Sequence, residues 1–382
     1  MRVVIVGAGI GGLALAYWLD RAGFEPVVIE AASKFEPLGH YLALRGTGVS
    51  VAREMGIEAA CRRRQATFAR TRFFRADGRL LRTLANDVSD RTLGGYILFR
   101  RSDLHEALNE AVAQRIPVHF GVRPEAIRQD AQRVTVRLSD GEEVSADFLV
   151  GADGIHSATR RLVFGTGFAR RLGGRYIGLT LRFDHGMDTS ADDAYFGVGQ
   201  MAALMPTDAD RISGIMYHGD RSGPPADRQA LKPFLQRTFA GFAAPVRELI
   251  ERIQPDSYLF SDDIAQISMP SIVSGRVTLV GDAAHCPTFM SGMGSALALQ
   301  DARALARHLA RQPSPDGLLA YQAAMQPVAE AYARSARRLA PFLLRGSQPR
   351  SWVRNTLVHL LPNRLIERGM QDFYNVERVA NR

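Results

Sequence analysis

The feature that most restricts the fold is at the start of the chain, where an apolar strand runs into a glycine-rich turn. Val3 to Val6 are all β-branched, which is typical of a strand buried on both faces. The turn GAGIGG follows, and residues 13–19 then carry apolar side chains at helical spacing. A second apolar strand, residues 26–29, ends at Glu30. This order predicts a β-α-β unit that begins a parallel sheet.

The glycine spacing in this unit is the one that binds dinucleotides. Gly7, Gly9 and Gly12 fit the pattern G-x-G-x-x-G, which allows a tight turn, close approach to a pyrophosphate and close helix packing. The helix N-terminus offers free N–H groups and a positive dipole end to the anion. Glu30 lies 23 residues after Gly7, where it can accept a hydrogen bond from a ribose hydroxyl. A strand precedes the motif and a helix follows it. A tight turn that binds no ligand is therefore the less favoured interpretation.

Two further glycine motifs follow buried strands later in the chain. GADGIHSATR (residues 151–160) follows one, and GDAAHCPTFMSGMG (residues 281–294) follows the other. Asp153 and Asp282 therefore lie at strand ends, where open α/β sheets bind ligands. An ordinary Asp-Gly turn would explain Asp153 alone nearly as well. Motifs at opposite ends of one chain predict two halves of a single extended cofactor.

The third motif also contains His285 and Cys286, which suggest a catalytic or metal-binding role. No matching cluster of cysteine and histidine accompanies them, so we predict no metal site. The pair Gly292 and Gly294 precedes a helix whose N-terminal N–H groups could face a developing negative charge.

Between the second and third motifs the chain changes character. Residues 175–218 alternate as strands do, with Ile177 and Leu179 on one face and Tyr176 and Thr180 on the other. Residues 67–84 predict a hairpin, and residues 228–253 predict a helical stretch. The predicted fold class is α/β, a Rossmann-like domain with an inserted, mostly antiparallel β-sheet domain and a C-terminal helix. The predicted boundaries are 1–66, 95–165 and 270–340 for the cofactor domain, 67–94 and 166–269 for the substrate domain, and 341–382 for the C-terminal segment.

The C-terminal segment has apolar residues at helical spacing. The favoured interpretation is a helix that covers the core, and contact with a membrane surface or a second copy is the alternative. The apolar residues are Trp352, Leu357, Leu360, Leu361, Leu365, Ile366, Met370 and Phe373.

Charge and composition exclude other classes of protein. The net charge is +9, but the positive residues are almost all arginines scattered in short pairs, whereas nucleic-acid binders concentrate charge on one face. No apolar run approaches the ~20 residues of a membrane span. Two cysteines cannot form a disulfide framework, and no signal peptide pattern precedes the first strand. We expect a cytoplasmic protein with no nucleic-acid partner and no membrane span.

The three motifs, in this order and spacing, resemble the group A flavoprotein monooxygenases, the para-hydroxybenzoate hydroxylase-like family. The resemblance covers roughly residues 1–341 and is closest to tetracycline-inactivating and antibiotic-tailoring monooxygenases. It implies FAD as cofactor, NADPH or NADH as electron donor, and no separate nicotinamide domain. The chain departs from the family where Met293 replaces the usual Gln and Ala296 replaces a frequent Asn.

The resemblance also implies which residues contact the cofactor. The first glycine motif would hold the pyrophosphate, Glu30 the adenosine ribose, and Asp282 the ribityl and pyrophosphate region. Asp153 and Gly154 would serve both FAD and the passing nicotinamide, and the last glycine turn would lie by the flavin pyrimidine ring. The expected set is Gly7, Gly9, Gly12, Glu30, Arg45, Arg101, Asp153, Gly154, Asp282, Gly292, Met293 and Gly294.

The implied activity is hydroxylation of an aromatic or polyketide-like small molecule with O2, through a flavin C4a-hydroperoxide. The inserted sheet would form the roof of the substrate site. No catalytic residue is assigned, although His218 is a candidate proton acceptor for a phenol. The candidate substrate-lining residues are Met205, Tyr217, Phe289 and Met290. A monomer or a homodimer is expected.

Other chemistries use the same scaffold. Flavin halogenases need a tryptophan pair and an active-site lysine, but Trp18 and Trp352 are far apart in the sequence and neither lysine is suitably placed. A prenyl reductase has no support in the sequence. A Baeyer–Villiger oxygenase stays open as an alternative, as does a flavoprotein with a non-redox or partner-dependent role. Consumption of NAD(P)H would distinguish these possibilities.

Overall fold

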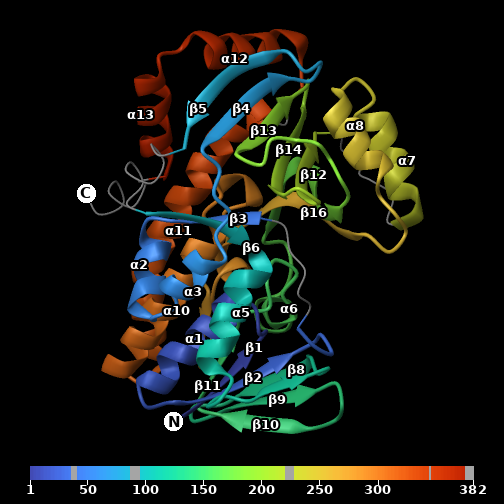
Figure 1. Ribbon diagram of the computed structural model, residues 1–382. Coiled ribbons are helices and arrows are strands. Elements are labelled where there is room, and N and C mark those ends of the chain that lie inside the picture. The colour runs from blue at the N-terminus through green and yellow to red at the C-terminus, as the bar shows by residue number, and fades with distance from the viewer. Residues whose placement is uncertain (36–40, 87–94, 220–227, 344–345, 375–382) are drawn as a thin grey trace.

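Two β-sheet domains are stacked along the long axis of the molecule (Figure 1). The computed structural model describes residues 1–35, 41–86, 95–219, 228–343 and 346–374. The predicted segments 67–94 and 341–382 thus include residues outside this description. The predicted fold class is confirmed, because a Rossmann-like α/β domain carries a second, mostly antiparallel sheet. The predicted domain boundaries stay predictions.

The cofactor domain is built on a six-stranded sheet with β1 near its centre. The strands next to β1 on either side are parallel to it. Val3 and Ile5 of β1 face α1 and α10, while Val4 and Val6 face a small three-stranded sheet, so both faces are buried as the β-branched run predicts. In spatial order the strands are β17 (Val273–Ser274), β18 (Val277–Leu279), β11 (Phe148–Gly151), β1 (Arg2–Val6), β2 (Glu25–Glu30) and β7 (Val118–Phe120).

Helices and two small sheets surround this central sheet. The small sheets are β8 (Pro124–Gln129), β9 (Val134–Leu138) and β10 (Glu143–Ala146), and the pair β3 (Tyr41–Arg45) and β6 (Tyr96–Arg100). The helices are α1 (Ile10–Arg21), α2 (Thr47–Glu54), α3 (Glu58–Arg63), α5 (Arg101–Val112), α6 (Ala158–Phe164), α9 (Asp282–His285), η1 (Phe289–Ser291) and α10 (Gly294–Arg311).

The substrate domain is a seven-stranded sheet, antiparallel except where β13 pairs with β4. The predicted alternation is confirmed, because Ile177 and Leu179 pack against helices α7 and α8, whereas Tyr176 lies on the opposite face. In spatial order the strands are β16 (Tyr258–Ile267), β12 (Ala169–Arg182), β15 (Arg211–His218), β14 (Gln200–Asp208), β13 (Ala191–Phe196), β4 (Arg70–Arg75) and β5 (Leu80–Ala85). The predicted hairpin is β4 and β5.

Two parts of the sequence prediction differ from the structure here. The helical stretch predicted for residues 228–253 is two helices, α7 (Arg228–Thr238) and α8 (Ala244–Glu251). The break contains Gly241, which lowers helix propensity, and Pro245 is in the first turn of α8, where proline is tolerated. Strand β16 was not predicted, because Asp262 and Asp263 interrupt its apolar alternation.

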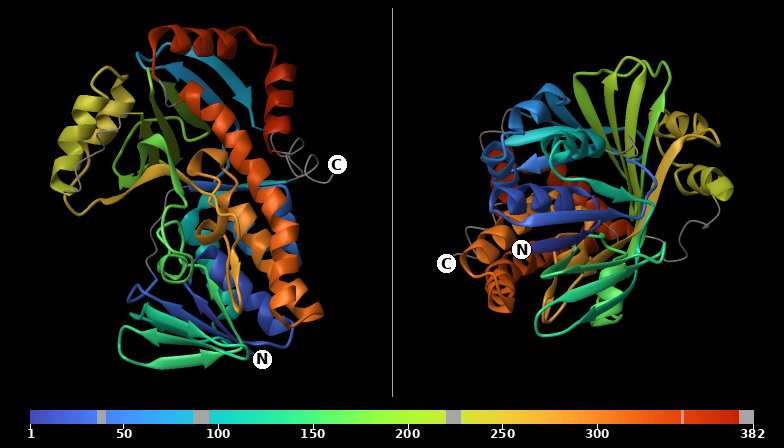
Figure 2. Two further views of the ribbon diagram at one scale, coloured as in Figure 1. Left: turned by 180° about the vertical axis from the view of Figure 1, so that it is seen from behind. Right: turned by 90° about the horizontal axis from the view of Figure 1, so that it is seen from below.

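Three helices form the C-terminal end of the described part of the chain. α11 (Pro315–Leu343) runs along the back of the molecule from the cofactor domain to the substrate domain (Figure 2, left). α12 (Gln348–Leu360) then crosses above β4 and β5, and α13 (Asn363–Tyr374) descends beside them (Figure 1). No helix among the described residues is both long and apolar enough to cross a bilayer.

The expectation that the C-terminal apolar residues cover the core is wrong for four of them. Trp352, Leu357 and Leu360 are exposed, because the inward face of α12 carries Ser351 and Arg354 instead, and Leu365 of α13 is exposed as well. The side chains of Met370 and Phe373 lie outside the described part of the chain.

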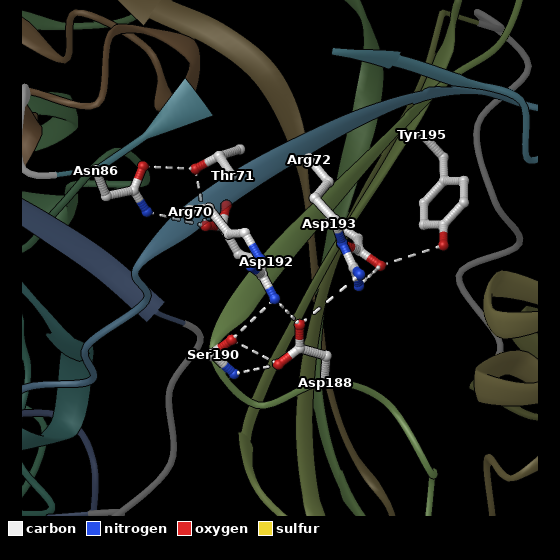
Figure 3. Close-up of polar contacts among 9 residues, drawn as sticks. All are labelled: Arg70, Thr71, Arg72, Asn86, Asp188, Ser190, Asp192, Asp193 and Tyr195. Carbon is white, nitrogen blue, oxygen red and sulfur yellow. Dashed lines mark hydrogen bonds and ion pairs between the residues drawn. The ribbon is translucent and has the colours of Figure 1, made fainter. Parts of the chain in front are cut away.

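A polar cluster joins β4 to β13 across the parallel pair (Figure 3). On one face of the sheet, Arg72 binds the buried Asp193 with both arms, Nε to Oδ1 at 2.6 Å and Nη2 to Oδ2 at 3.0 Å. On the other face, Thr71 donates to Asp192 Oδ1 at 2.8 Å, and Asn86 donates to the same oxygen at 3.3 Å. The cluster therefore ties the early hairpin to the rest of the domain.

We predict that Asp193→Asn destabilises the protein by about 2 kcal/mol, because it leaves the Arg72 guanidinium without its bidentate partner. The measurement is the thermal midpoint of the purified protein. The matched control is Asp188→Asn, which removes a more exposed partner of Arg70, and its effect should be smaller. Equal midpoints for Asp193→Asn and the wild type would contradict the prediction.

For Asp192 we predict the opposite effect, a substitution that stabilises the folded protein. Burial raises the pKa of this carboxyl to about 6, above its ordinary 3.8, so the folded protein keeps a proton that the unfolded chain releases. Stability therefore falls as pH rises from about 4 to about 6. Asp192→Asn keeps the Oδ1 acceptor and removes this loss, so the variant should be more stable at pH 7.5 by up to about 3 kcal/mol.

The measurement is the thermal midpoint of Asp192→Asn and wild type at steps from pH 4.5 to pH 8, where the gap should widen and then stay constant above pH 7. Asp188→Asn again serves as the control. Hydrogen bonds from Ser190 and Arg70 hold the pKa of Asp188 below its usual range, so its substitution should lower stability at neutral pH. A gap for Asp192→Asn that does not change with pH would refute the assignment.

Candidate functional site

The three glycine motifs meet at one edge of the six-stranded sheet. They follow β1, β11 and β18, which are neighbours and all parallel. Their carboxyl ends therefore point the same way, and the three following loops lie side by side. This edge is where open α/β sheets bind ligands.

The first loop has the geometry that its glycines predict. Gly7 has φ of +105°, and a Cβ added to Gly12 would lie 1.9 Å from the Gly7 carbonyl oxygen, so α1 can approach β1 only because Gly12 has no side chain. A Cβ on Gly9 would meet nothing within 4 Å, which leaves open space above the start of α1. No side chain caps α1 and its first turn has no acidic residue, so its N–H groups remain available to an anion.

Glu30 and His105 hold this loop in place. The Ala8 N–H donates to Glu30 Oε2 at 2.8 Å, and His105 Nε2 donates to the Ala8 carbonyl oxygen at 2.6 Å. Burial lowers the pKa of His105, which favours the neutral ring as the donor. Glu30 lies at the end of β2 as predicted. His105 was missed, because a histidine inside a helix gives no sequence signal of a loop contact 97 residues away.

The second loop folds around Asp153. Its carboxylate accepts from the Ser157 hydroxyl and, at 2.9 Å, from the Thr159 N–H, so it stabilises the start of α6. Gly154 has φ of +73° in this turn. Asp153 thus lies at the predicted edge, but both of its carboxylate oxygens accept hydrogen bonds from residues of the same loop.

Arg160 connects the second loop to the third and was also missed by the sequence analysis. Its Nη1 donates to the Ala283 carbonyl oxygen at 2.9 Å and its Nη2 donates to the Ile155 carbonyl oxygen. The guanidinium is buried, and burial lowers its pKa. The arginine in GADGIHSATR was the only sequence signal, and spacing alone could not show which carbonyl groups it reaches.

In the third loop, a buried carboxylate fixes the residues around Asp282. Asp301 of α10 accepts from the Gly281 N–H at 2.9 Å and from His285 Nε2 at 2.7 Å. His285 is therefore committed to an internal contact. Among the described residues, no group of three or more His, Cys, Asp or Glu side chains could hold a metal ion.

Asp282 itself points toward charged and polar neighbours. Burial raises the pKa of its carboxyl, while the Cys286 thiol hydrogen bond and the charge of Arg101 act in the opposite direction. Arg101 opens α5, so the structure brings this predicted cofactor residue close to Asp282.

The last glycine turn is strained and leads into an uncapped helix. Thr288, just before it, has φ of +88°, and its buried hydroxyl has no hydrogen-bond partner within the described part of the chain. Gly292 is left-handed, and Arg45 Nη1 donates to its carbonyl oxygen at 3.4 Å. α10 begins at Gly294 after Met293, with no side-chain cap and no acidic residue in its first turn. Backbone strain and unsatisfied polar groups are common at ligand sites, so this turn is a candidate binding site.

The roof sheet presents an apolar, aromatic surface to this turn. Met205 and Ile215 cluster with Phe289, while Tyr217 and Met290 belong to an adjoining cluster. The four predicted substrate residues thus lie in two neighbouring clusters. Tyr176, which was missed, stacks on Phe289 with ring centroids 4.3 Å apart.

His218 lies on the opposite side of the sheet from Tyr217. It is buried, and its ring packs against Phe234 of α7 at 4.9 Å between centroids. It therefore faces the outer helices rather than the turn at Gly292, which does not favour the predicted role as a proton acceptor for the substrate.

These residues fit FAD at both ends. The open space above Gly9 and the free N–H groups of α1 suit a pyrophosphate, and Glu30 lies at the end of β2 where a ribose would be. The strained turn and the uncapped start of α10 suit the polar edge of a flavin ring.

Comparison with known proteins agrees with this geometry. A family model described as "FAD binding domain" matches residues 1–336. The chain is 31% identical over 314 residues to a flavin-dependent monooxygenase from Legionella longbeachae serogroup 1 (strain NSW150), covering 81% of this chain and 80% of that protein. It is 30% identical over 368 residues to the 2-heptyl-3-hydroxy-4(1H)-quinolone synthase of Pseudomonas aeruginosa PAO1, covering 95% of each.

A solved structure shows the same architecture. Klebsiella pneumoniae HpxO complexed with FAD and uric acid superposes with a TM-score of 0.87 at 26% identity, covering 98% of this chain and 97% of that one. The family match and the shared loops lead to one conclusion: the chain belongs to the FAD-binding-domain family and is a group A FAD-dependent monooxygenase.

Proposed function

We propose that the protein is a single-component monooxygenase that uses NADPH or NADH and O2 to hydroxylate a flat, electron-rich aromatic small molecule. The observation that carries the proposal is the aromatic stack of Tyr176 on Phe289, immediately before the glycine turn at 292–294. An aromatic surface next to a flavin-type turn suits a planar ring. The names of two relatives, a quinolone synthase and a uric acid complex, also refer to ring compounds with carbonyl groups.

FAD, when bound, would accept a hydride from NAD(P)H and activate O2 at its C4a carbon for transfer of one oxygen atom. The chain would supply position and charge. Gly7, Gly9 and Gly12 would hold the pyrophosphate, with Glu30 at the adenosine ribose. Asp282 and Arg101 would hold the middle of the cofactor from two sides of the loop edge.

The end of the site near the flavin ring would be electropositive. The first N–H groups of α10 and the Arg45 guanidinium, which contacts the Gly292 carbonyl, would stabilise negative charge on the pyrimidine side. Met293 is buried in this turn, so its backbone rather than its side chain would face the cofactor. Asp153 and Gly154 would shape the neighbouring loop.

Apolar roof residues would exclude water and orient the substrate. Met205, Phe289 and Met290 offer apolar surface, and the Tyr217 hydroxyl is buried without a hydrogen-bond partner among the described residues. That hydroxyl would donate a hydrogen bond to a polar atom of the substrate. Burial raises the pKa of Tyr217, so it would act as a neutral donor.

The proposed function is tested by anaerobic mixing of the FAD-loaded protein with NADPH or NADH, followed by the flavin absorbance band. Bleaching accelerated by one class of phenol, quinolone or polyketide would support the proposal and identify the substrate class. Aerobic product analysis then distinguishes a hydroxylated ring from the ring-expanded ester of a Baeyer–Villiger oxygenase. No bleaching by either nicotinamide, with FAD bound, would refute a single-component enzyme.

We further predict that Asp282→Ala weakens FAD binding about 100-fold or more, because the cofactor would lose the carboxylate proposed to bind its ribityl and pyrophosphate region. The measurement is FAD stoichiometry after gel filtration, with Kd from flavin fluorescence. Asp140→Ala, in the exposed turn between β9 and β10, is the control and should keep full FAD content. Normal FAD content in Asp282→Ala would remove Asp282 from the site.

A further inference from the structure

Helix α12 is turned with its apolar face outward. Trp352 is 69% exposed and Leu360 68%, and Val353 and Leu357 on the same arc are 41% and 46% exposed. The inward face carries Ser351 and Arg354 instead, and Arg354 is only 8% exposed. A surface helix normally buries its apolar stripe, so this arrangement is the reverse of the usual one.

Arg354 fixes this orientation. Its Nη2 donates to the Gly197 carbonyl oxygen at 2.9 Å, and its guanidinium lies over the Phe196 ring at 4.9 Å from the centroid. By binding the roof sheet, Arg354 thus holds α12 in an orientation in which Trp352 and Leu360 point outward. The exposed stripe is a consequence of a specific contact rather than of a loosely packed helix.

The stripe is part of a larger exposed apolar patch. Ten large hydrophobic side chains are exposed in the described part of the chain, and five of them lie on α12 and α13. Two others, Leu80 and Val198, line the same groove as Trp352 and Leu360, which has a volume of about 650 Å³. Apolar surface gathered in one place marks an interaction site, whereas exposed leucines scattered singly do not.

The surroundings of the patch are cationic. α12 contains no Asp or Glu, and the exposed Arg79 and Arg350 lie at its borders. The only acidic residue among the described residues that line the groove is Asp77, which pairs with Arg75 at 3.1 Å. A second copy docked through a two-fold axis would bring like charges together, which disfavours that partner.

We infer that this face binds the surface of an anionic lipid bilayer. A helix with an exposed Trp and leucines, bordered by arginines, has the composition of an interfacial helix that inserts its apolar face at the headgroup boundary. The lipid phosphates would pair with Arg79 and Arg350. The 13 residues of α12 are too few to span a bilayer, which takes ~20, so the contact is peripheral.

The test uses the full-length, FAD-loaded protein and sucrose-loaded vesicles of phosphatidylcholine with equal phosphatidylglycerol, separated by centrifugation. The electrostatic contribution to binding is measured with vesicles of phosphatidylcholine alone and with a repeat at 0.5 M salt. We expect binding to the anionic vesicles that weakens clearly in both comparisons. No sedimentation with anionic vesicles would overturn the inference.

Two variants separate the apolar and charged parts. Trp352→Gln/Leu360→Gln should reduce the partition coefficient about tenfold or more, since two apolar side chains no longer leave water. Arg79→Gln/Arg350→Gln should weaken binding and reduce its salt dependence. Leu319→Gln, a leucine on α11 that is 48% exposed and lies outside the patch, is the control and should bind as the wild type does. An equal loss in Leu319→Gln would show non-specific adsorption and overturn the inference.

Trp352 also reports the contact directly. In a Trp18→Phe background it is the only tryptophan, so lipids brominated near the headgroup should quench its fluorescence on binding. Sedimentation velocity excludes the competing explanation. A wild-type dimer that Trp352→Gln/Leu360→Gln converts to monomer, with vesicle binding unchanged, would make the patch an interface between copies. A thermal midpoint lowered by that variant would show that the chain itself covers the stripe, and either result would overturn the inference.

Discussion

The site depends on one topological constraint, the adjacency of three parallel strands. β18, β11 and β1 lie side by side, so loops that are more than a hundred residues apart in sequence share one edge. Arg160 then holds two of these loops together from inside, with its guanidinium on the carbonyl groups of Ile155 and Ala283. Buried carbonyl groups paired with a buried guanidinium leave few alternative arrangements, because any opening would leave charged or polar groups unsatisfied.

Two carboxylates, Asp301 and Asp153, make internal hydrogen bonds that hold the loops at this edge. Asp301 binds the Gly281 N–H and His285 within the protein, and Asp153 binds Ser157 and Thr159. Asp282, with Arg101 nearby, takes no part in these internal contacts, and we propose that it faces the cofactor. Internal carboxylates therefore hold the loops rigid, so that the residues aimed at the ligand need little rearrangement.

The roof sheet contacts the cofactor domain on one side and the C-terminal helix α12 on another. The roof sheet buries one face against α7 and α8 and turns an aromatic face to the cofactor domain. Arg354 of α12 reaches the same sheet at Gly197, and this contact directs an apolar stripe to the outside of the molecule. One sheet thus contacts both the turn at Gly292 and the helix that carries the exposed apolar stripe.

The sequence by itself determined the fold class, the three motifs and the sheet edge they share, because strand burial and glycine geometry leave local patterns. It also determined the alternation of residues 175–182 and the hairpin of β4 and β5. Only the tertiary structure decided the side-chain contacts between residues that are far apart in the sequence. His105, Arg160 and Tyr176 act through contacts with residues far away in the chain, and His218 faces outward because of the strand's register. The outward turn of α12 likewise follows from Arg354, since helical spacing shows which residues share a face but not which face is buried.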